Sequence, residues 1–93
     1  MKVRVLKKTS NELKLEIEGA GHALCNLLQK RLIEDKSVDF AGYDVPHPLT
    51  PKVIIYVRTK RKAKPEVVLR ETVRKTREMN KKLSEELKKA FKT

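Results

Sequence analysis

The chain has 93 residues, the size of one small domain with a thin hydrophobic core. Its residues are 39% hydrophobic and 38% charged, and no run approaches the ~20 apolar residues that a membrane span requires. The single cysteine excludes an internal disulfide, and the N-terminus lacks the apolar core of a signal peptide, so we expect a soluble cytoplasmic protein. The net charge of +11 indicates either a polyanionic or acidic partner or the Lys- and Glu-rich surface typical of thermophiles.

A β-hairpin is predicted over about residues 2–18. Val3 and Val5 alternate with basic residues, and the segment at 13–17 alternates leucine or isoleucine with charged residues. Alternation with a period of two is typical of strands that bury one face and expose the other. The Thr-Ser-Asn-Glu sequence at 9–12 has the composition of a turn between the two strands.

A helix over about 21–35 and two further strands are predicted next. Leucines at every fourth position define an amphipathic helix with one apolar stripe: Leu24, Leu28 and Leu32. Strands follow at about 38–45 and 52–59, and the second, apolar on both faces, is predicted to be central in the sheet. Three prolines within residues 46–51 require an extended loop or a sheet edge between them.

A basic segment follows the last predicted strand, without an acidic residue among its members. It contains Arg58, Lys60, Arg61, Lys62 and Lys64. Such a cluster either contacts phosphate groups or forms a solvated turn before a helix, and the sequence leaves both interpretations open. The aromatic residues are too few to form a stacking surface for single-stranded nucleic acid.

A single long helix is predicted from Pro65 to about residue 92. Pro65 occupies the favoured first turn, and no Gly or Pro interrupts the chain after it. The helix would be about 42 Å long, whereas a domain of this size is only about 30 Å across. Its seam residues are spaced by alternating steps of four and three, as in a heptad repeat: Leu69, Val73, Thr76, Asn80, Leu83, Leu87 and Ala90, with Phe91 beside them. We therefore expect another chain to cover the far end of the seam; the alternative is that the last two turns fray in solvent.

The predicted elements have the order ββαββα. This order is typical of one two-layer α+β domain, here over residues 1–93. We expect an antiparallel sheet packed by two helices, of which the C-terminal one is long.

His22 and Cys25 form the candidate pair for chemistry. A catalytic cysteine needs a base and a third, orienting group, and a zinc site needs at least three protein ligands. Cys25 falls among leucines on the apolar stripe, where a thiol behaves as a small hydrophobic group. No Gly-rich phosphate loop or Ser/His/Asp set is present. We therefore predict no catalytic residue, no metal site and no cofactor.

Two motifs suggest a family. IEGAGHALCNLL, then FAGYDVPHPL, followed by a long amphipathic C-terminal segment, resembles subunit L of archaeal DNA-directed RNA polymerase. This family includes the eleventh subunit of eukaryotic polymerase II and the N-terminal domain of the bacterial α-subunit. The resemblance extends from about Val3 to the end of the chain, and the two motifs together are more specific than either alone.

The resemblance implies a non-catalytic assembly subunit of the polymerase. In this family the L subunit pairs with the polymerase's D subunit, and the heterodimer supports the large catalytic subunits. DNA and RNA would then be met only through the assembled polymerase, and no membrane is involved. By the same analogy, a loop is presented to neighbouring subunits by Tyr43, Pro46, His47 and Pro48. The predicted partner interface comprises Leu24, Leu28, Leu32, Leu69, Val73, Thr76, Asn80, Leu83, Leu87 and Phe91.

The alternative is a small basic nucleic-acid-binding protein that forms a homodimer through its C-terminal helix. The net charge favours this alternative. The polar members of the seam favour the polymerase subunit, because a polar residue in a seam selects a particular partner.

Overall fold

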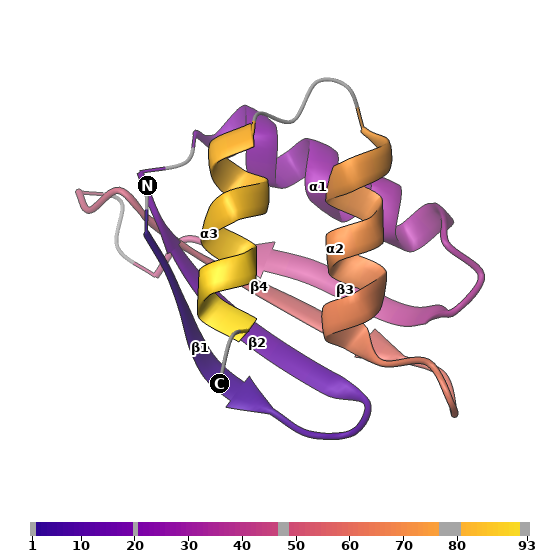
Figure 1. The fold of residues 1–93 in the computed structure, drawn as a ribbon. Helices are drawn as coiled ribbons and strands as arrows, with labels where there is room; N and C mark the ends of the chain where they lie inside the picture. Colours follow the sequence, from indigo (N-terminus) through magenta and orange to yellow (C-terminus); the bar gives the residue numbers. More distant parts are fainter. Residues whose placement is uncertain (1, 20, 47–48, 77–80, 92–93) are drawn as a thin grey trace.

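The computed structural model describes residues 2–19, 21–46, 49–76 and 81–91. Within these ranges the chain forms four strands and three helices (Figure 1). Their bounds, in chain order, are β1 Lys2–Lys8, β2 Glu12–Glu18, α1 His22–Glu34, β3 Val38–Asp44, β4 Lys52–Thr59, α2 Pro65–Lys75 and α3 Lys81–Phe91. The predicted α+β class is confirmed.

The four strands form one antiparallel sheet in the order β1-β2-β4-β3. β2 and β4 are internal, as predicted for the segment at 52–59. Leu15 pairs with Ile55 and Leu13 pairs with Val57, so the apolar side chains of the two internal strands share one face of the sheet.

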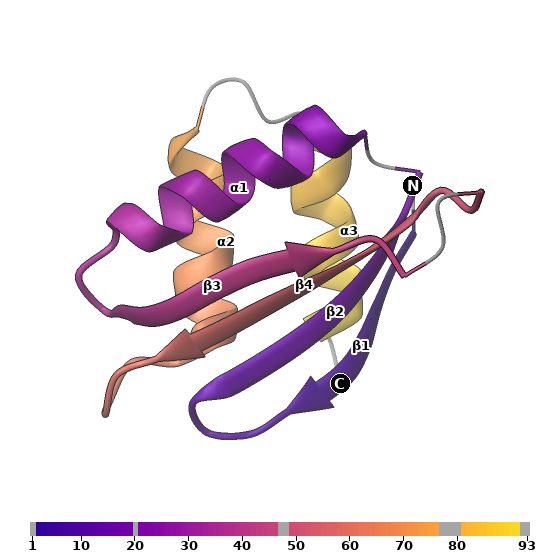
Figure 2. The same ribbon diagram turned by 180° about the vertical axis from the view of Figure 1, so that it is seen from behind.

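All three helices cover this face, which we call the inner face, and they leave the outer face open (Figures 1 and 2). α1 contacts β3 and β4, α2 contacts β4 and β2, and α3 contacts β1. The core between the layers consists of aliphatic side chains and one thiol, each at most 3% exposed: Leu13, Leu15, Ile17, Cys25, Leu28, Leu32, Val53, Ile55, Val57, Leu69, Val73, Leu83 and Leu87.

The prediction of one helix from residue 65 to residue 92 is wrong, because α2 and α3 are separate. α2 ends at Lys75, and Thr76 has an extended backbone with φ −98° and ψ 110°. α3 runs back alongside α2 in the opposite direction (Figure 1). Leu83 and Leu87 are 1% and 0% exposed, so in this conformation the chain covers the far end of the seam itself. That another chain contacts the seam stays a prediction. The reversal is favoured because a straight helix would project these side chains into water beyond a domain of 37 × 26 × 26 Å.

Candidate subunit interface

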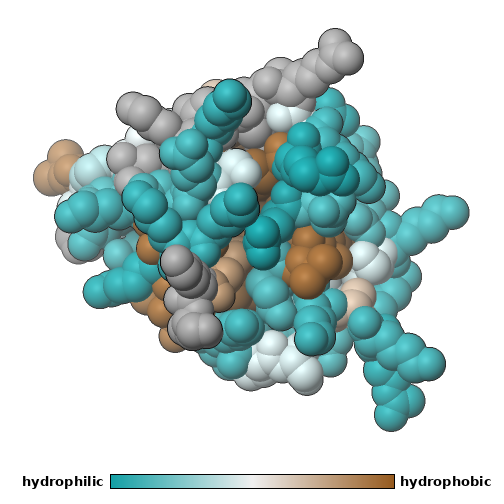
Figure 3. All heavy atoms as spheres, in the orientation of Figure 1, coloured by the Kyte–Doolittle hydropathy of each residue, from teal (hydrophilic) through white to brown (hydrophobic). Residues whose placement is uncertain are grey.

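A groove runs along the outer surface of the helix layer, between α2 and α3. Figure 3 shows hydrophilic side chains on both helices, with hydrophobic surface between them. Two adjoining hollows of about 530 and 330 Å³ share Arg70 of α2 and Lys88 of α3. Apolar surface comes from Val67, which is 51% exposed, and from Phe91. We call the surface formed by Val67, Arg70, Arg74, Ser84, Lys88 and Phe91 the helix groove.

The helix groove carries more positive than negative charge. Its charged lining residues are four cations and two carboxylates: Arg70, Arg74, Lys88, Lys89, Glu71 and Glu85. Arg74 donates to Glu71 at 2.7 Å, and this hydrogen bond lowers the pKa of the Glu71 carboxyl and raises that of the guanidinium. Neither Arg70 nor Lys88 forms a salt bridge within the described part of the chain. A partly apolar groove with surplus positive charge suits an amphipathic helix with acidic side chains.

Most of the residues predicted to contact a partner lie in the chain's own core. Those with at most 3% exposure are Leu28, Leu32, Leu69, Val73, Leu83 and Leu87. Thr76 is also buried, and its hydroxyl donates to the carbonyl oxygen of Thr72 at 2.8 Å. Leu24 and Phe91 are half-buried at the edge of the core, whereas Asn80 lies outside the described residues. In this conformation only Leu24 and Phe91 of the described set reach the surface.

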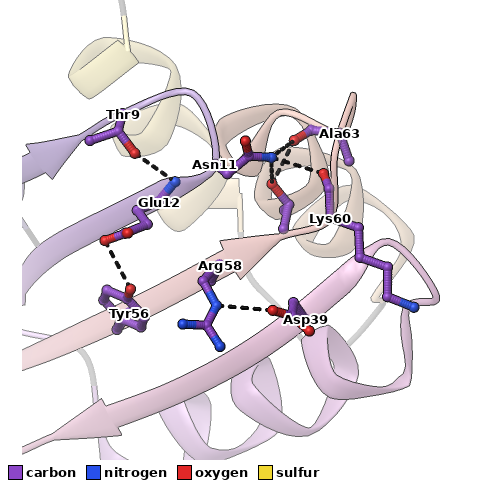
Figure 4. A network of polar contacts seen from close by, with 9 residues as sticks. Thr9, Asn11, Glu12, Asp39, Tyr56, Arg58, Lys60 and Ala63 are labelled. Carbon is purple, nitrogen blue, oxygen red and sulfur yellow. Dashed lines mark hydrogen bonds and ion pairs between the residues drawn. The ribbon is translucent and has the colours of Figure 1, made fainter.

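Of the residues predicted to contact phosphate, Arg58 lies near the end of β4 and the others follow the strand, at one end of the sheet (Figure 4). Arg58 donates to Asp39 at 3.0 Å, so its charge is already paired. The backbone of the next turn is held by the Asn11 amide, which donates to the Lys60 carbonyl oxygen at 2.8 Å. Lys62 has a φ of 73°, in the left-handed region that turns the chain. The exposed cations of this turn are Lys60, Arg61, Lys62 and Lys64.

Residues 12–86 match a family model described as the RNA polymerase Rpb3/Rpb11 dimerisation domain. The chain belongs to this family. Proteins named DNA-directed RNA polymerase subunit Rpo11 from Saccharolobus shibatae and Saccharolobus solfataricus are each 39% identical to it over 88 residues, which cover 95% of this chain and 96% of the relative. Rpo11 from Methanosarcina acetivorans is 42% identical over 72 residues, or 77% of either chain.

The fold agrees with a solved member of the family. The crystal structure of DNA-directed RNA polymerase subunit L from Thermoplasma acidophilum matches with a TM-score of 0.72 at 29% identity, covering 97% of this chain and 88% of that one. The resemblance to archaeal subunit L is thereby confirmed. The chain is a DNA-directed RNA polymerase subunit of the Rpb11/L family, and its dimerisation domain implies other polymerase subunits as partners.

Cys25, one of the two candidates for chemistry, lies in the hydrophobic core. Cys25 is 1% exposed, and burial raises the pKa of its thiol, which opposes formation of the reactive thiolate. His22 is the first residue of α1. The described ranges contain no group of three or more His, Cys, Asp or Glu residues that could hold a metal ion. No helix in these ranges is long and apolar enough to span a membrane.

The loop predicted to face neighbouring subunits is described only in part. Tyr43 is half-buried and packs against the core, and Pro46 is exposed. His47 and Pro48 lie outside the described residues. The loop's role in contacts therefore stays a prediction.

Sequence reasoning missed Val67 and the aromatic residues of the outer sheet face. Phe40 and Tyr56 occupy strand positions that alternate with the buried residues Ala41 and Ile55. For Tyr56 that phase was the available signal, because a large residue on the solvent side of an alternating strand is a candidate contact residue. For Phe40 there was none, because the register shifts between Val38 and Phe40, and simple alternation from the buried Val38 places Phe40 on the inner face.

Proposed function

We propose that the chain is a non-catalytic assembly subunit that pairs with the D subunit of the polymerase. The resulting heterodimer forms the platform on which the large catalytic subunits assemble for transcription. The observation that carries this proposal is the match of residues 12–86 to a polymerase dimerisation domain. The buried, high-pKa thiol of Cys25 is consistent with the non-catalytic role.

The proposed contact surface for the D subunit is the helix groove together with Leu24. Support comes from the surplus of cations along the groove and from the exposed Val67 side chain. The buried members of the predicted interface hold the helices in place beneath the groove: Leu28, Leu32, Leu69, Val73, Leu83 and Leu87. Leu83 and Leu87 would touch the D subunit directly only if α3 left the sheet.

Coexpression with the D subunit of the same organism tests this surface. Arg70→Glu combined with Lys88→Glu replaces two groove cations by carboxylates, and copurification of the D subunit should fall about tenfold or more. Lys8→Glu combined with Lys36→Glu makes the same charge change at exposed positions outside the groove and is the matched control. Equal copurification of the D subunit by both double variants would contradict the proposed surface.

Direct nucleic-acid binding through a homodimer is the second candidate function, and the net charge of +11 favours it. The exposed cations at 60–64 would then bind phosphate in the free chain. We propose instead that nucleic acid is reached only through the assembled polymerase. Binding of the free chain to a DNA duplex should therefore be weak and lost at about 0.15 M salt; tight binding at that salt would favour the second function.

A further inference from the structure

The outer face of the sheet holds a hollow among its polar side chains. Phe40 of β3 is 50% exposed, and its ring lies 5.7 Å from the ring of Tyr56 on β4, at an angle of 59°. Together with Ile54, these rings border a hollow of about 340 Å³. Figure 2 shows the sheet from this open side. We call the surface formed by Phe40, Gly42, Ile54 and Tyr56 the aromatic hollow.

The register of the strands explains why the aromatic hollow forms. Gly42 pairs with Tyr56 across β3 and β4, and its missing side chain leaves a gap on the outer face. The Phe40 ring lies over this gap: a Cβ added to Gly42 would be 3.4 Å from two carbons of that ring. The neighbouring residues Ala41 and Ile55 are buried on the inner face. The aromatic hollow and the helix groove therefore lie on opposite sides of the molecule and can be occupied at the same time.

The part of the outer face formed by the two internal strands is electrically balanced, although the whole chain carries a charge of +11. The two internal strands contribute three cations and three carboxylates to it: Lys14, Lys52, Arg58, Glu12, Glu16 and Glu18. Beside the hollow, Arg58 is paired with Asp39, and the Tyr56 hydroxyl donates to Glu12 at 3.0 Å (Figure 4). The two internal strands offer a phosphate no surplus of cations, so this surface does not favour nucleic acid.

Two groups on the rim indicate the chemistry of the occupant. Lys14 and Asp44 line the hollow, and neither forms a salt bridge with another described residue. An exposed aromatic surface ringed by polar groups is typical of the centre of a protein interface, where one anchor side chain is shielded from water.

We propose that the aromatic hollow docks a third polymerase chain. That chain inserts a leucine, methionine or phenylalanine side chain, flanked by an acidic group facing Lys14 and a basic group facing Asp44. The inference rests on the proposed function, because it assumes that the D subunit occupies the opposite side of the molecule.

The test follows two steps of assembly after coexpression with the D subunit and the large polymerase subunits of the same organism. Phe40→Glu places a charge in the hollow, and Gly42→Val fills it without adding charge. Ile33→Glu, at a position on α1 that is 57% exposed, is the matched control. We expect all three variants to pair with the D subunit and to melt like the wild type. The amount of chain recovered in the larger assembly should fall about tenfold or more for Phe40→Glu and Gly42→Val, but not for Ile33→Glu. Phe40→Leu, which keeps an apolar side chain at this position, should be recovered like the wild type.

A photo-cross-linking residue, p-benzoylphenylalanine, at position 40 identifies the occupant. We expect a cross-link to an apolar residue of a large polymerase subunit. A cross-link to DNA or RNA, no cross-link, or equal assembly of Phe40→Glu and Ile33→Glu would overturn the inference, while the heterodimer with the D subunit would still stand. Failure of the wild-type chain to pair with the D subunit would overturn the proposed function, and the inference with it.

Discussion

The two faces of the sheet are formed by the same strands, yet they differ in burial and in what they contribute to stability. On the inner face Leu13 and Leu15 are 0% exposed beneath the helices, and burial contributes about 1.5–3 kcal/mol for each such side chain. On the outer face Lys14 lies between them in sequence, and the nearby pair Lys7–Glu12, at 3.1 Å, is partly exposed to solvent. Exposed ion pairs contribute about 0–1 kcal/mol. The inner face therefore carries the stability of the fold, which leaves the outer face available for recognition.

The largest expected effect is that of truncating an inner-face side chain. Leu15→Ala should lower the free energy of unfolding by about 2–5 kcal/mol, because it leaves a cavity in the core. Lys14→Ala, one residue away on the outer face, should change it by less than about 0.5 kcal/mol. Urea unfolding measures both values. An equal loss of unfolding free energy in the two variants would contradict the conclusion that the inner face carries most of the stability.

A polar contact at the end of the inner face should have an intermediate effect. Asn11 donates to the Lys60 carbonyl oxygen at 2.8 Å, and its amide also reaches the hydroxyl of the buried Thr59. Asn11→Ala should therefore lower the free energy of unfolding by about 1 kcal/mol. Asn26→Ala, at an exposed position on α1, is the control and should lose no stability. An Asn11→Ala variant as stable as the wild type would show that this contact does not hold the turn.

The smallest effect is expected away from both faces, where α1 ends. The Asp35 carboxylate accepts hydrogen bonds from the Ser37 hydroxyl at 2.6 Å and from the Ser37 backbone N–H at 2.8 Å, and these lower the pKa of Asp35. The stability from this contact is present above the ordinary aspartate pKa of about 3.9 and is lost as the pH falls through the lower folded value.

Ser37→Ala removes the hydroxyl donor and should raise the pKa of Asp35 part of the way towards its ordinary value. An NMR titration of the carboxyl carbons measures this shift. Glu71 serves as the internal reference, because its pKa is lowered by Arg74 and should not respond. An unchanged Asp35 titration in Ser37→Ala would assign the pKa shift to another group.

The hairpin strands were predictable because they depend on local alternation, as in the LKLEI segment at 13–17. The reversal after Thr76 was not, since residues 76–80 contain no Gly or Pro that would end a helix. The seam spacing of four and three is the same whether Leu83 and Leu87 pack against another chain or against the chain's own sheet. In this structure α3 packs on β1 and buries both leucines. The local sequence contains no signal for this long-range contact.

The candidate site was less predictable than the fold, because it depends on which residues the sheet brings together. The aromatic hollow requires Gly42 to pair with Tyr56, and that register appears only when β3 and β4 are aligned. The helix groove requires Arg70 and Lys88, eighteen positions apart, to meet across two antiparallel helices. The family resemblance, by contrast, depended on contiguous motifs and could be seen in the sequence itself.

The mass of an equimolar mixture with the D subunit of the same organism tests the central claim most directly. Size-exclusion chromatography with light scattering should give a single species whose mass is the sum of one copy of each chain. Two separate peaks, or a homodimer of this chain beside the free D subunit, would contradict the account of it as one half of that heterodimer.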